Sequence, residues 1–179
     1  MSGKAIQTTI ERYSTTLHSA SGFSCGNASL DEYIRVHQER DESDHTAVTF
    51  VLLDKEAVSN PTQILGYFTL SSFALPRQQA RRRDRDKHLG RYDSVPAVLL
   101  GRLAIDGRFQ GQGLGSAIIL ASLTKVLRIR EEIGISVIVV HAIDEAAAAF
   151  YQHQGFTQFR DEPFHFYYPL ARIAVGLDQ

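Results

Sequence analysis

The chain has 179 residues, one cysteine and a net charge of −1 at pH 7, with 44% hydrophobic and 22% charged residues. These values are typical of one soluble globular domain, spanning residues 1–179, with a sizeable core. They exclude a disulfide framework and a cysteine-based zinc site. No stretch approaches the roughly 20 apolar residues of a membrane span. The first 20 residues show no signal-peptide pattern, so we expect a cytoplasmic protein that does not contact membranes.

The charge is unevenly distributed along the chain. Residues 1–75 carry 5 basic and 9 acidic groups, residues 76–135 carry 12 and 6, and residues 136–179 carry 2 and 5. The basic middle third predicts a polyanionic partner. A solvated basic loop accounts for the same charge equally well.

The first third predicts a strand followed by a helix. The strand is expected within Ile6–Thr16. After a turn at Phe23–Asn27, either Asn27 or Ser29 can cap a helix over about Leu30–Asp44. Helical spacing predicts one buried face, made of Leu30, Tyr33, Ile34 and His37. Asp31 and Glu32 then fall on the solvated half of this helix.

Two β-rich runs follow, Thr46–Leu53 and Gln63–Leu75. The turn signals Asp54, Asn60 and Pro61 separate them, which predicts a hairpin. The next segment, residues 76–93, is rich in arginine and almost without apolar residues, so we expect an exposed loop or a short polar helix.

The second half predicts a strand–helix–strand unit. The continuous apolar runs Ala97–Ile105 and Ile135–Ala142 indicate central, parallel strands. The helix between them is expected from about Gly113 to Glu132, with Gly134 beyond its end. Its predicted buried residues are Leu114, Ile118, Ile119, Leu123, Val126 and Leu127.

A short helix and two strands complete the chain. Asp144 is expected to cap a helix over Ala146–Gln154, and strands are expected at Thr157–Phe159 and Phe164–Leu170. Together the elements predict a mixed α+β sheet flanked by helices.

The most informative stretch is Leu99–Gly115, where an apolar strand leads through a glycine-rich turn into a helix. Bare amides at a helix start, approached through glycines, favour a phosphate group. The stretch lacks the Lys-Ser/Thr pair of a P-loop after Gly115, and its glycines do not have the dinucleotide-binding spacing. The spacing present is Gln110-x-x-Gly113-x-Gly115.

That spacing resembles the acyl-CoA signature of the Gcn5-related N-acetyltransferases (GNAT), whose loop amides hold the pyrophosphate of coenzyme A. Features in the family order follow it over about 75 residues: the second strand to Ala142, then a helix bearing Phe150 and Tyr151. The resemblance implies a GNAT fold, with a central mixed sheet splayed around an acetyl-CoA cleft.

Several segments are similar in sequence to one branch of this family, the acetyltransferase toxins of bacterial type II toxin–antitoxin modules. The similar segments are Phe23–Tyr33, Leu100–Asp106, Gly111–Gly115, Val140–Asp144, Ala149–Phe156 and the end at Tyr168–Leu170. This resemblance implies acetylation of the amino group of aminoacyl-tRNA, a block of translation, a ribbon-helix-helix antitoxin and a homodimer.

The resemblance also implies roles for individual residues. Tyr151 matches the family's catalytic tyrosine, which protonates the departing thiolate. Backbone N–H groups near Leu103–Ile105 are expected to stabilise the oxyanion. The expected acetyl-CoA contacts are Leu103, Ala104, Ile105, Gln110, Gly111, Gln112, Gly113, Leu114, Gly115, Ser116, His141, Asp144 and Phe150.

The basic residues are candidates for contacts with the tRNA backbone or with the acidic tail of an antitoxin. They are Arg77, Arg81, Arg82, Arg83, Arg85, Lys87 and Arg91, helped by Arg102 and Arg108. Arg108 can instead face the phosphates of coenzyme A.

Other candidate groups carry weaker signals. His141 ends a central strand, where it can relay the amine's proton or be a satisfied core histidine. Cys25 lacks an indicated partner for nucleophilic catalysis and is expected to pack as a small apolar side chain. The histidines show no metal-ligand spacing, so no metal is expected.

Two other functions remain open from the residues. One is acetylation of a small amine or a protein amino group, and the other is a non-catalytic acyl-CoA-binding regulator. The basic middle third disfavours a polyamine substrate, which requires an acidic cleft. A Tyr151 that points into the core would favour the regulator.

Overall fold

The computed structural model describes residues 6–56 and 63–173. Over these residues the chain forms seven strands: β1 (Thr8–Arg12), β2 (Val48–Asp54), β3 (Ile64–Pro76), β4 (Ser94–Ile105), β5 (Val137–His141), β6 (Thr157–Gln158) and β7 (His165–Pro169). The helices of the same ranges are α1 (Ala28–Glu32), α2 (Gln38–Ser43), α3 (Arg82–Lys87), α4 (Leu114–Ile129) and α5 (Glu145–His153), with a π-helical turn η1 (Tyr33–His37). Short 3-10 turns are η2 (Arg77–Gln79), η3 (Gly107–Phe109) and η4 (Leu170–Arg172).

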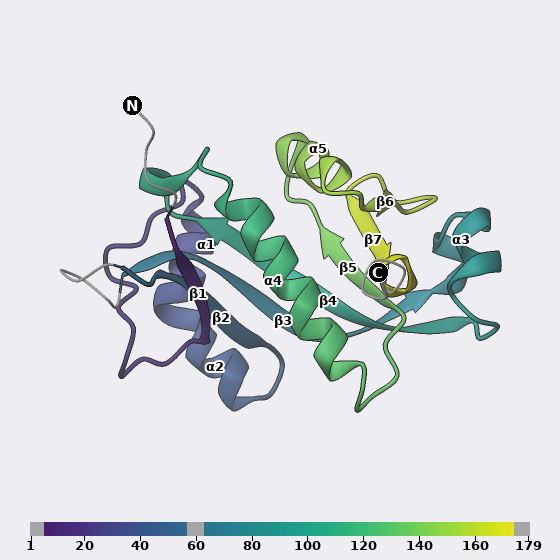
Figure 1. Cartoon of the computed structure of the whole chain (residues 1–179), viewed down its shortest axis with the longest axis horizontal. Coiled ribbons are helices and arrows are strands. Elements are labelled where there is room, and N and C mark those ends of the chain that lie inside the picture. The colour runs from purple at the N-terminus through teal and green to yellow at the C-terminus, as the bar shows by residue number, and fades with distance from the viewer. Residues whose placement is uncertain (1–5, 57–62, 174–179) are drawn as a thin grey trace. The chain divides into compact units, whose positions relative to one another are not determined.

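The strands form one mixed sheet in the order β1-β2-β3-β4-β5-β7-β6 (Figure 1). β2 pairs antiparallel with both β1 and β3, which confirms the predicted hairpin. Its turn signals Asn60 and Pro61 lie outside the described residues. β4 and β5 are parallel and β7 is antiparallel to β5 and β6, so the predicted mixed α+β sheet is confirmed.

The chain divides into two compact units. Unit 1 comprises Met1–Leu70 and Arg102–Ala121, and unit 2 comprises Ser71–Gly101 and Ser122–Gln179. β3, β4 and α4 contribute residues to both units. That residues 1–179 form a single domain stays a prediction.

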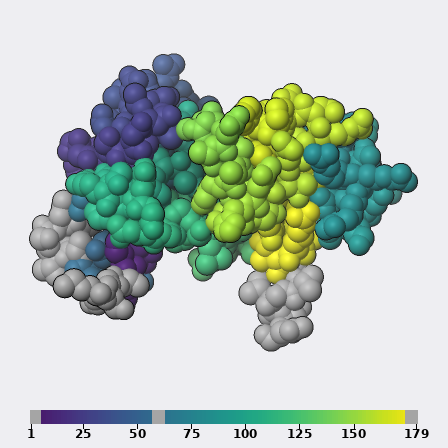
Figure 2. Space-filling view, turned by 90° about the horizontal axis from the view of Figure 1, so that it is seen from above, coloured from purple at the N-terminus to yellow at the C-terminus, as the bar shows by residue number. Residues whose placement is uncertain are grey.

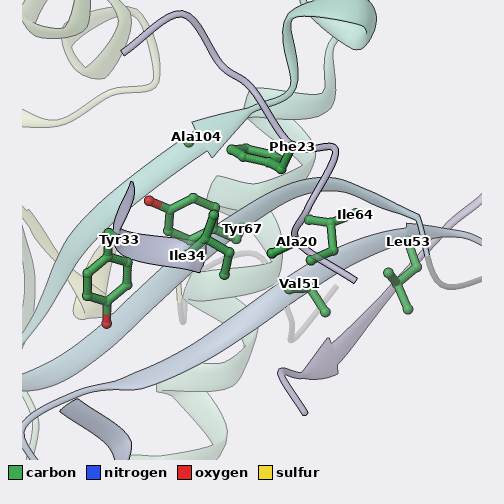
Figure 3. Close-up of a cluster of buried hydrophobic side chains, with 9 residues drawn as sticks. All are labelled: Ala20, Phe23, Tyr33, Ile34, Val51, Leu53, Ile64, Tyr67 and Ala104. Carbon is green, nitrogen blue, oxygen red and sulfur yellow. The ribbon is translucent and has the colours of Figure 1, made fainter. Parts of the chain in front are cut away.

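Unit 1 is built on an aromatic cluster (Figure 3). Its buried members are Ala20, Phe23, Tyr33, Ile34, Val51, Leu53, Ile64, Tyr67 and Ala104. Tyr67 meets the ring of Phe23 edge-on at 5.5 Å and stacks with Tyr33 at 6.0 Å. Its hydroxyl donates to the carbonyl of Leu30 at 2.7 Å. The chain segment before α1, and α1 itself, are therefore fixed against β3.

The first helix contains a π-helical turn that periodicity does not predict. Asn27 caps α1 as expected, its Oδ1 accepting a hydrogen bond from the N–H of Leu30 at 3.2 Å. The π turn inserts an extra residue, so the next buried position falls on Gln38, which is 4% exposed. His37 is exposed, and its predicted burial is wrong for this reason.

Unit 2 packs both faces of its part of the sheet. One face holds the buried cluster Leu75, Ala80, Leu89, Val95, Ala97, Val137, Val139, Phe159 and Tyr167. On the other face Phe166 of β7, which pairs with Val140, lies 6.4 Å from the ring of Tyr151 on α5. Figure 1 shows α5 beside β5 and β7.

The buried positions of α4 agree with the prediction at four residues, Leu114, Ile118, Ile119 and Val126. Leu123 and Leu127 are half-buried, while the small polar Ser122 is fully buried. The apolar stripe is therefore shifted by one position in the second half of the helix.

Replacing Gly66 with alanine is expected to destabilise the protein. A Cβ there would lie 2.6 Å from Cδ1 of Ile105 and 2.8 Å from the carbonyl oxygen of Ala104, a backbone atom. We expect the free energy of unfolding to fall by about 1–3 kcal/mol in urea denaturation. The matched control is Gly134→Ala, whose new Cβ meets nothing within 4 Å among the described residues. Equal stability of the two variants would contradict this close packing.

Candidate functional site

The loop between β4 and α4 belongs to unit 1. Gly111 (φ +74°) and Gly113 (φ +81°) adopt the left-handed conformation that favours glycine. The carbonyl of Gly113 accepts from the N–H of Ala117 at 3.2 Å, so the last residue of the loop is joined to the first turn of α4. Residues 110–113 are exposed. The predicted succession of strand, glycine turn and helix start is present, and phosphate binding there stays a prediction.

Asp106 is the centre of this loop and is 1% exposed. Its Oδ1 accepts from the backbone N–H and the Nε of Arg108, at 3.0 and 2.8 Å. Its Oδ2 accepts from Nη2 of Arg108 at 2.7 Å and from the N–H of Ser24 at 3.3 Å. Burial raises the pKa of Asp106, but these donors outweigh burial and lower it below the ordinary value.

The segment before α1 supports the same loop. The N–H of Gly107 donates to the carbonyl of Ser24 at 2.8 Å. The side-chain amide of Gln110 donates to the carbonyls of Cys25 and Ile105, both at 2.9 Å. Gln110 thus commits its amide hydrogens to the scaffold of the loop, whereas sequence spacing indicated only a cofactor contact.

Asp31 supports that segment from the helix side. It is 7% exposed and accepts from the N–H of Cys25 at 2.7 Å and from the hydroxyl of Ser24 at 3.0 Å. Burial raises the pKa of Asp31, but the hydrogen bonds and Arg35 lower it overall. Its predicted solvation is wrong, because these donors come from the turn before the helix.

Cys25 is half-buried and packs against the core of unit 1. Burial raises the pKa of its thiol to about 11, and the hydrogen bond and negative charge of Asp31 act in the same direction. A thiol held protonated is a poor nucleophile, in agreement with its predicted packing role.

The other predicted cofactor residues of unit 1 present different groups. The side chains of Ala104, Ile105 and Leu114 are buried, so any ligand contact there falls to the backbone. Leu103 is half-buried, Gly115 lies in α4 and Ser116 is exposed on its first turn. Gln112 donates to the carbonyl of Arg108 at 3.4 Å.

Tyr151, the predicted catalytic residue, lies on α5 in unit 2 and is 7% exposed. Its ring is in edge contact with Phe150 at 5.4 Å and Phe156 at 5.7 Å. Burial raises the pKa of Tyr151 to about 12, so the phenol is protonated at neutral pH. A protonated phenol can serve as a proton donor.

Asp144, a predicted cofactor contact, caps α5. Its Oδ1 accepts from the N–H of Ala147 at 2.7 Å. Phe150 is also a predicted cofactor contact, and it is half-buried on the same helix. Asp144 thus fixes the start of the helix that carries Tyr151, Phe150 contacts the Tyr151 ring, and the contacts of both residues with a cofactor stay predictions.

His141 ends β5, as the sequence predicts. Its imidazole stacks on that of His165 with centroids 3.8 Å apart and meets the edge of Phe73 at 5.7 Å. Burial, followed by the neighbouring His165, lowers the pKa of His141, while Glu162 opposes them.

The basic segment, residues 76–93, contains the short helix α3, one of the two alternatives that the sequence predicts. Arg77 donates to the carbonyls of Gly90 and Arg85, and Arg81 donates to those of Gln158 and Phe159. These two arginines stabilise the segment, whereas the sequence marked them only as candidate phosphate contacts.

A buried carboxylate anchors α3 to β7. Asp84 is 2% exposed and accepts from the hydroxyl of Tyr167 at 2.6 Å and from Arg172 at 2.7 Å. The same hydroxyl accepts from the N–H of Arg81 at 2.9 Å. Burial raises the pKa of Asp84, but Tyr167 and Arg172 lower it overall.

The remaining cations of the segment are directed outward. Arg83, Lys87 and Arg91 are exposed, Arg85 is half-exposed, and Arg82 is exposed beside Asp86 at 3.8 Å. A surface hollow of about 600 Å³ is lined by Arg77, Arg85, Asp86, Lys87, Gly90 and Arg91. Figure 2 shows this segment in teal against the yellow surface of the late strands.

Arg102 and Arg108 are engaged within unit 1. The guanidinium of Arg102 lies 3.7 Å above the ring of Tyr33 and 3.6 Å from Asp41. Arg108 holds Asp106, as described above. Both were predicted to help bind phosphates, and in the structure both charges already have partners.

Among the described residues no group of histidine, cysteine, aspartate or glutamate side chains is placed to hold a metal ion. Within residues 6–56 and 63–173, helices of the length and apolarity needed to cross a membrane do not occur.

Replacing Asp106 with asparagine is expected to destabilise the protein in a pH-dependent way. Asparagine places an NH₂ group against N–H donors, and removing hydrogen bonds to a charged group costs about 1.5–3 kcal/mol each. The folded-state pKa of Asp106 is depressed, so its contribution is present above the unfolded pKa and disappears as pH falls through the folded value. Urea denaturation should show a large deficit at pH 7 that shrinks below about pH 4.

The control for this variant is Asp44→Asn, at an exposed ion pair with Arg40, for which we expect less than about 1 kcal/mol. A deficit for Asp106→Asn that does not change between neutral and acidic pH would contradict the assigned role of the carboxylate.

Comparison with known proteins identifies the family. Residues 49–158 match the acetyltransferase (GNAT) domain. The chain is 31% identical to the tRNA-acetylating toxin of Mycobacterium tuberculosis, over 86% of this chain and 89% of that protein. Its structure is similar to AtaT complexed with acetyl-methionyl-tRNAfMet (TM-score 0.84, 26% identity, 94% of this chain and 98% of the other).

It is also similar to a mutant AtaT toxin bound to the C-terminus of the antitoxin AtaR and acetyl-CoA (TM-score 0.78, 25% identity, 96% and 99%). The chain therefore belongs to the GNAT acetyltransferases and, within them, to the toxins of toxin–antitoxin systems.

Proposed function

We propose that this acetyltransferase transfers the acetyl group of acetyl-CoA to the α-amino group of an aminoacyl-tRNA and thereby blocks translation in the cytoplasm. The observation that carries the proposal is the exposed glycine loop at the start of α4, in a chain 31% identical to a tRNA-acetylating toxin. A complex of a structural relative with an acetylated aminoacyl-tRNA supports the choice of substrate.

The chain's own groups fit acetyl-CoA. The amides of Gly111–Gly115 would bind its diphosphate, because helix-start N–H groups attract anions. The pairing of β5 with β4 ends at Leu100 and Val140, while β4 continues to Ile105. The N–H groups of Arg102 and Asp106 donate to β3. By strand alternation those of Leu103 and Ile105 point to the other edge, where they would be available to bind the pantetheine arm and to stabilise the oxyanion.

The proposed reaction uses Tyr151 as an acid. The amine attacks the thioester carbonyl, and the C–S bond breaks to release a thiolate. Tyr151 donates its phenolic proton to that thiolate, which is possible because its raised pKa keeps the phenol protonated.

The exposed cations of the basic segment are proposed to bind the tRNA backbone. Our proposal leaves out Arg77, Arg81, Arg102 and Arg108, whose guanidinium groups have partners inside the fold. The remaining candidates are Arg82, Arg83, Arg85, Lys87 and Arg91. An acidic antitoxin tail would bind the same surface and so compete with the substrate.

The proposal also includes the partners of the toxin: an antitoxin with a ribbon-helix-helix fold and a second copy of the toxin in a homodimer. Binding of the AtaR C-terminus by a structural relative supports an antitoxin partner.

One observation favours a second candidate function, a non-catalytic acyl-CoA-binding regulator. The ring of Tyr151 is only 7% exposed and packs among aromatic side chains. Turnover by the unmodified protein separates the two. Incubation with labelled acetyl-CoA and total charged tRNA should label specific aminoacyl ends. Binding of acetyl-CoA without transfer to tRNA, to small amines or to proteins would support the regulator.

Tyr151→Phe is expected to lose most turnover, about 100-fold or more, while retaining the fold and the affinity for acetyl-CoA. The ring and its packing remain, and only the proton donor is removed. Acetylation kinetics and calorimetry with acetyl-CoA measure the two effects. Tyr168→Phe, on β7, is the matched control and should keep its activity. Undiminished turnover of Tyr151→Phe would exclude the catalytic role.

Reversing the charge at Arg83 and Lys87 is expected to weaken tRNA binding without changing acetyl-CoA affinity. For each phosphate that is no longer bound, the slope of log K against log salt should fall by about 1. The KM for charged tRNA, measured over a salt series, tests this. Arg128→Glu, an exposed charge on α4, is the control. Identical salt dependence in all three proteins would remove the basic segment from the substrate site.

A further inference from the structure

Unit 2 contains a stacked pair of imidazoles, His141 on β5 and His165 on β7. The two residues are register partners, and their ring centroids lie 3.8 Å apart with planes inclined by 18°. Aromatic edges enclose the pair: Phe73 meets His141 at 5.7 Å and Phe159 meets His165 at 5.6 Å. Both histidines are half-buried.

The pair lies on the sheet face opposite to Tyr151. Side chains alternate along a strand, so His141 shares a face with Val139, and His165 shares it with Tyr167. Tyr167 is the residue that anchors α3. Tyr151 instead contacts Phe166, on the other face. The imidazoles therefore lie on the face that carries the basic segment.

His141 also occupies the point where the β4–β5 pairing ends. The last pair of this ladder is Leu100 with Val140, and His141 is the next residue. Within the described chain, His141 is therefore not followed by further pairing with β4, and the backbone that continues past Leu100 is not joined to β5.

The Nε2 atom of His141 is buried and has no hydrogen-bond partner among the described residues. An orphaned buried N–H is rarer than an under-satisfied acceptor, so the favoured tautomer carries its proton on Nδ1 and leaves a lone pair on Nε2. A half-turn about Cβ–Cγ keeps the ring plane, and hence the stack, while changing the edge that Nε2 faces.

The groups around the ring keep it neutral. Burial and His165 lower the pKa of His141, and Glu162 is the opposing charge. An ordinary α-amino group has a pKa of about 8 and is mostly protonated at neutral pH. The acceptor therefore has to lose a proton before it can attack, and a neutral imidazole is suited to accept it.

We propose that His141 is the general base that deprotonates the α-ammonium group of the aminoacyl acceptor, an assignment that rests on the proposed function. One N–H proton moves to Nε2 of His141. The freed lone pair forms the C–N bond as the C–S bond breaks, and the thiolate takes the proton of Tyr151. The second N–H proton leaves the new amide and restores Tyr151 through water, and His141 returns its proton to solvent.

The test is the pH dependence of single-turnover acetylation. The substrate is a tRNA carrying its amino acid through a 3′-amide, which resists hydrolysis at high pH. His141→Gln should be about 100-fold slower than the unmodified protein near pH 6. The deficit should shrink to a few-fold near pH 9, where the amine is already neutral. Added imidazole should partly restore His141→Ala.

Two further variants test the sign of the effect. His165→Phe keeps a stacked ring but removes a group that lowers the pKa of His141. The acidic limb of the pH–rate profile of acetylation should therefore move to higher pH. Glu162→Gln removes a group that raises it, so the limb should move to lower pH. His153→Gln, exposed on α5, is the control and should match the unmodified profile.

The outcomes separate the two proposals. If the unmodified protein acetylates charged tRNA but His141→Gln has the same profile, or a deficit equal at every pH, the general base is overturned and the proposed function stands. If the unmodified protein acetylates no charged tRNA, the proposed function fails, and the assignment of His141 fails with it.

Discussion

The candidate site depends on a carboxylate that the fold has removed from water. An unpaired buried charge costs several kcal/mol, and Asp106 is tolerated because backbone and guanidinium N–H groups surround it. Those donors come from Ser24, before the first helix, and from Arg108, in the loop itself. The glycine loop therefore receives its shape from residues more than 80 positions apart in the chain. A loop fixed in this way loses little conformational freedom when it binds a ligand.

Much of the fold could be predicted from local patterns. The caps Asn27 and Asp144 and the two apolar parallel strands are all governed by the chain within a few residues of themselves. The glycines of the loop could also be predicted locally, since the positive φ at Gly111 and Gly113 favours glycine whatever the distant contacts are. The π turn is different: nothing in residues 33–37 breaks the helical spacing, so the shift of burial from His37 to Gln38 could not be read from periodicity.

The candidate site was less predictable, because the decisive partners are distant. Asp31, Gln110 and Arg81 are residue types that suit solvent equally well. Whether the carboxylate of Asp31 faces water or accepts from a backbone amide and a hydroxyl depends on tertiary structure alone. Composition identified the arginine-rich segment, but it could not separate the side chains that hold that segment from those that face outward.

Burial acts on Tyr151 and His141, two of the ionisable groups of unit 2, in opposite and complementary ways. It disfavours the charged form of each, so it keeps the phenol of Tyr151 protonated and the imidazole of His141 unprotonated. The proposed acid and the proposed base can therefore hold these protonation states at neutral pH without any charged neighbour to stabilise them. The strand alternation then separates the groups onto opposite sides of the sheet, where they do not exchange protons directly.

The anchoring of α3 by Asp84, Tyr167 and Arg172 separates maintenance of the fold from the proposed recognition of tRNA within one short helix. Asp84, which points inward, fixes the position of the helix, so its outward neighbours contribute little to stability. Such a surface is free to diverge: if it binds tRNA or antitoxin as proposed, successive substitutions at the outward positions can change the preferred partner while the underlying framework stays unchanged. Co-evolution of a toxin with its antidote requires this latitude.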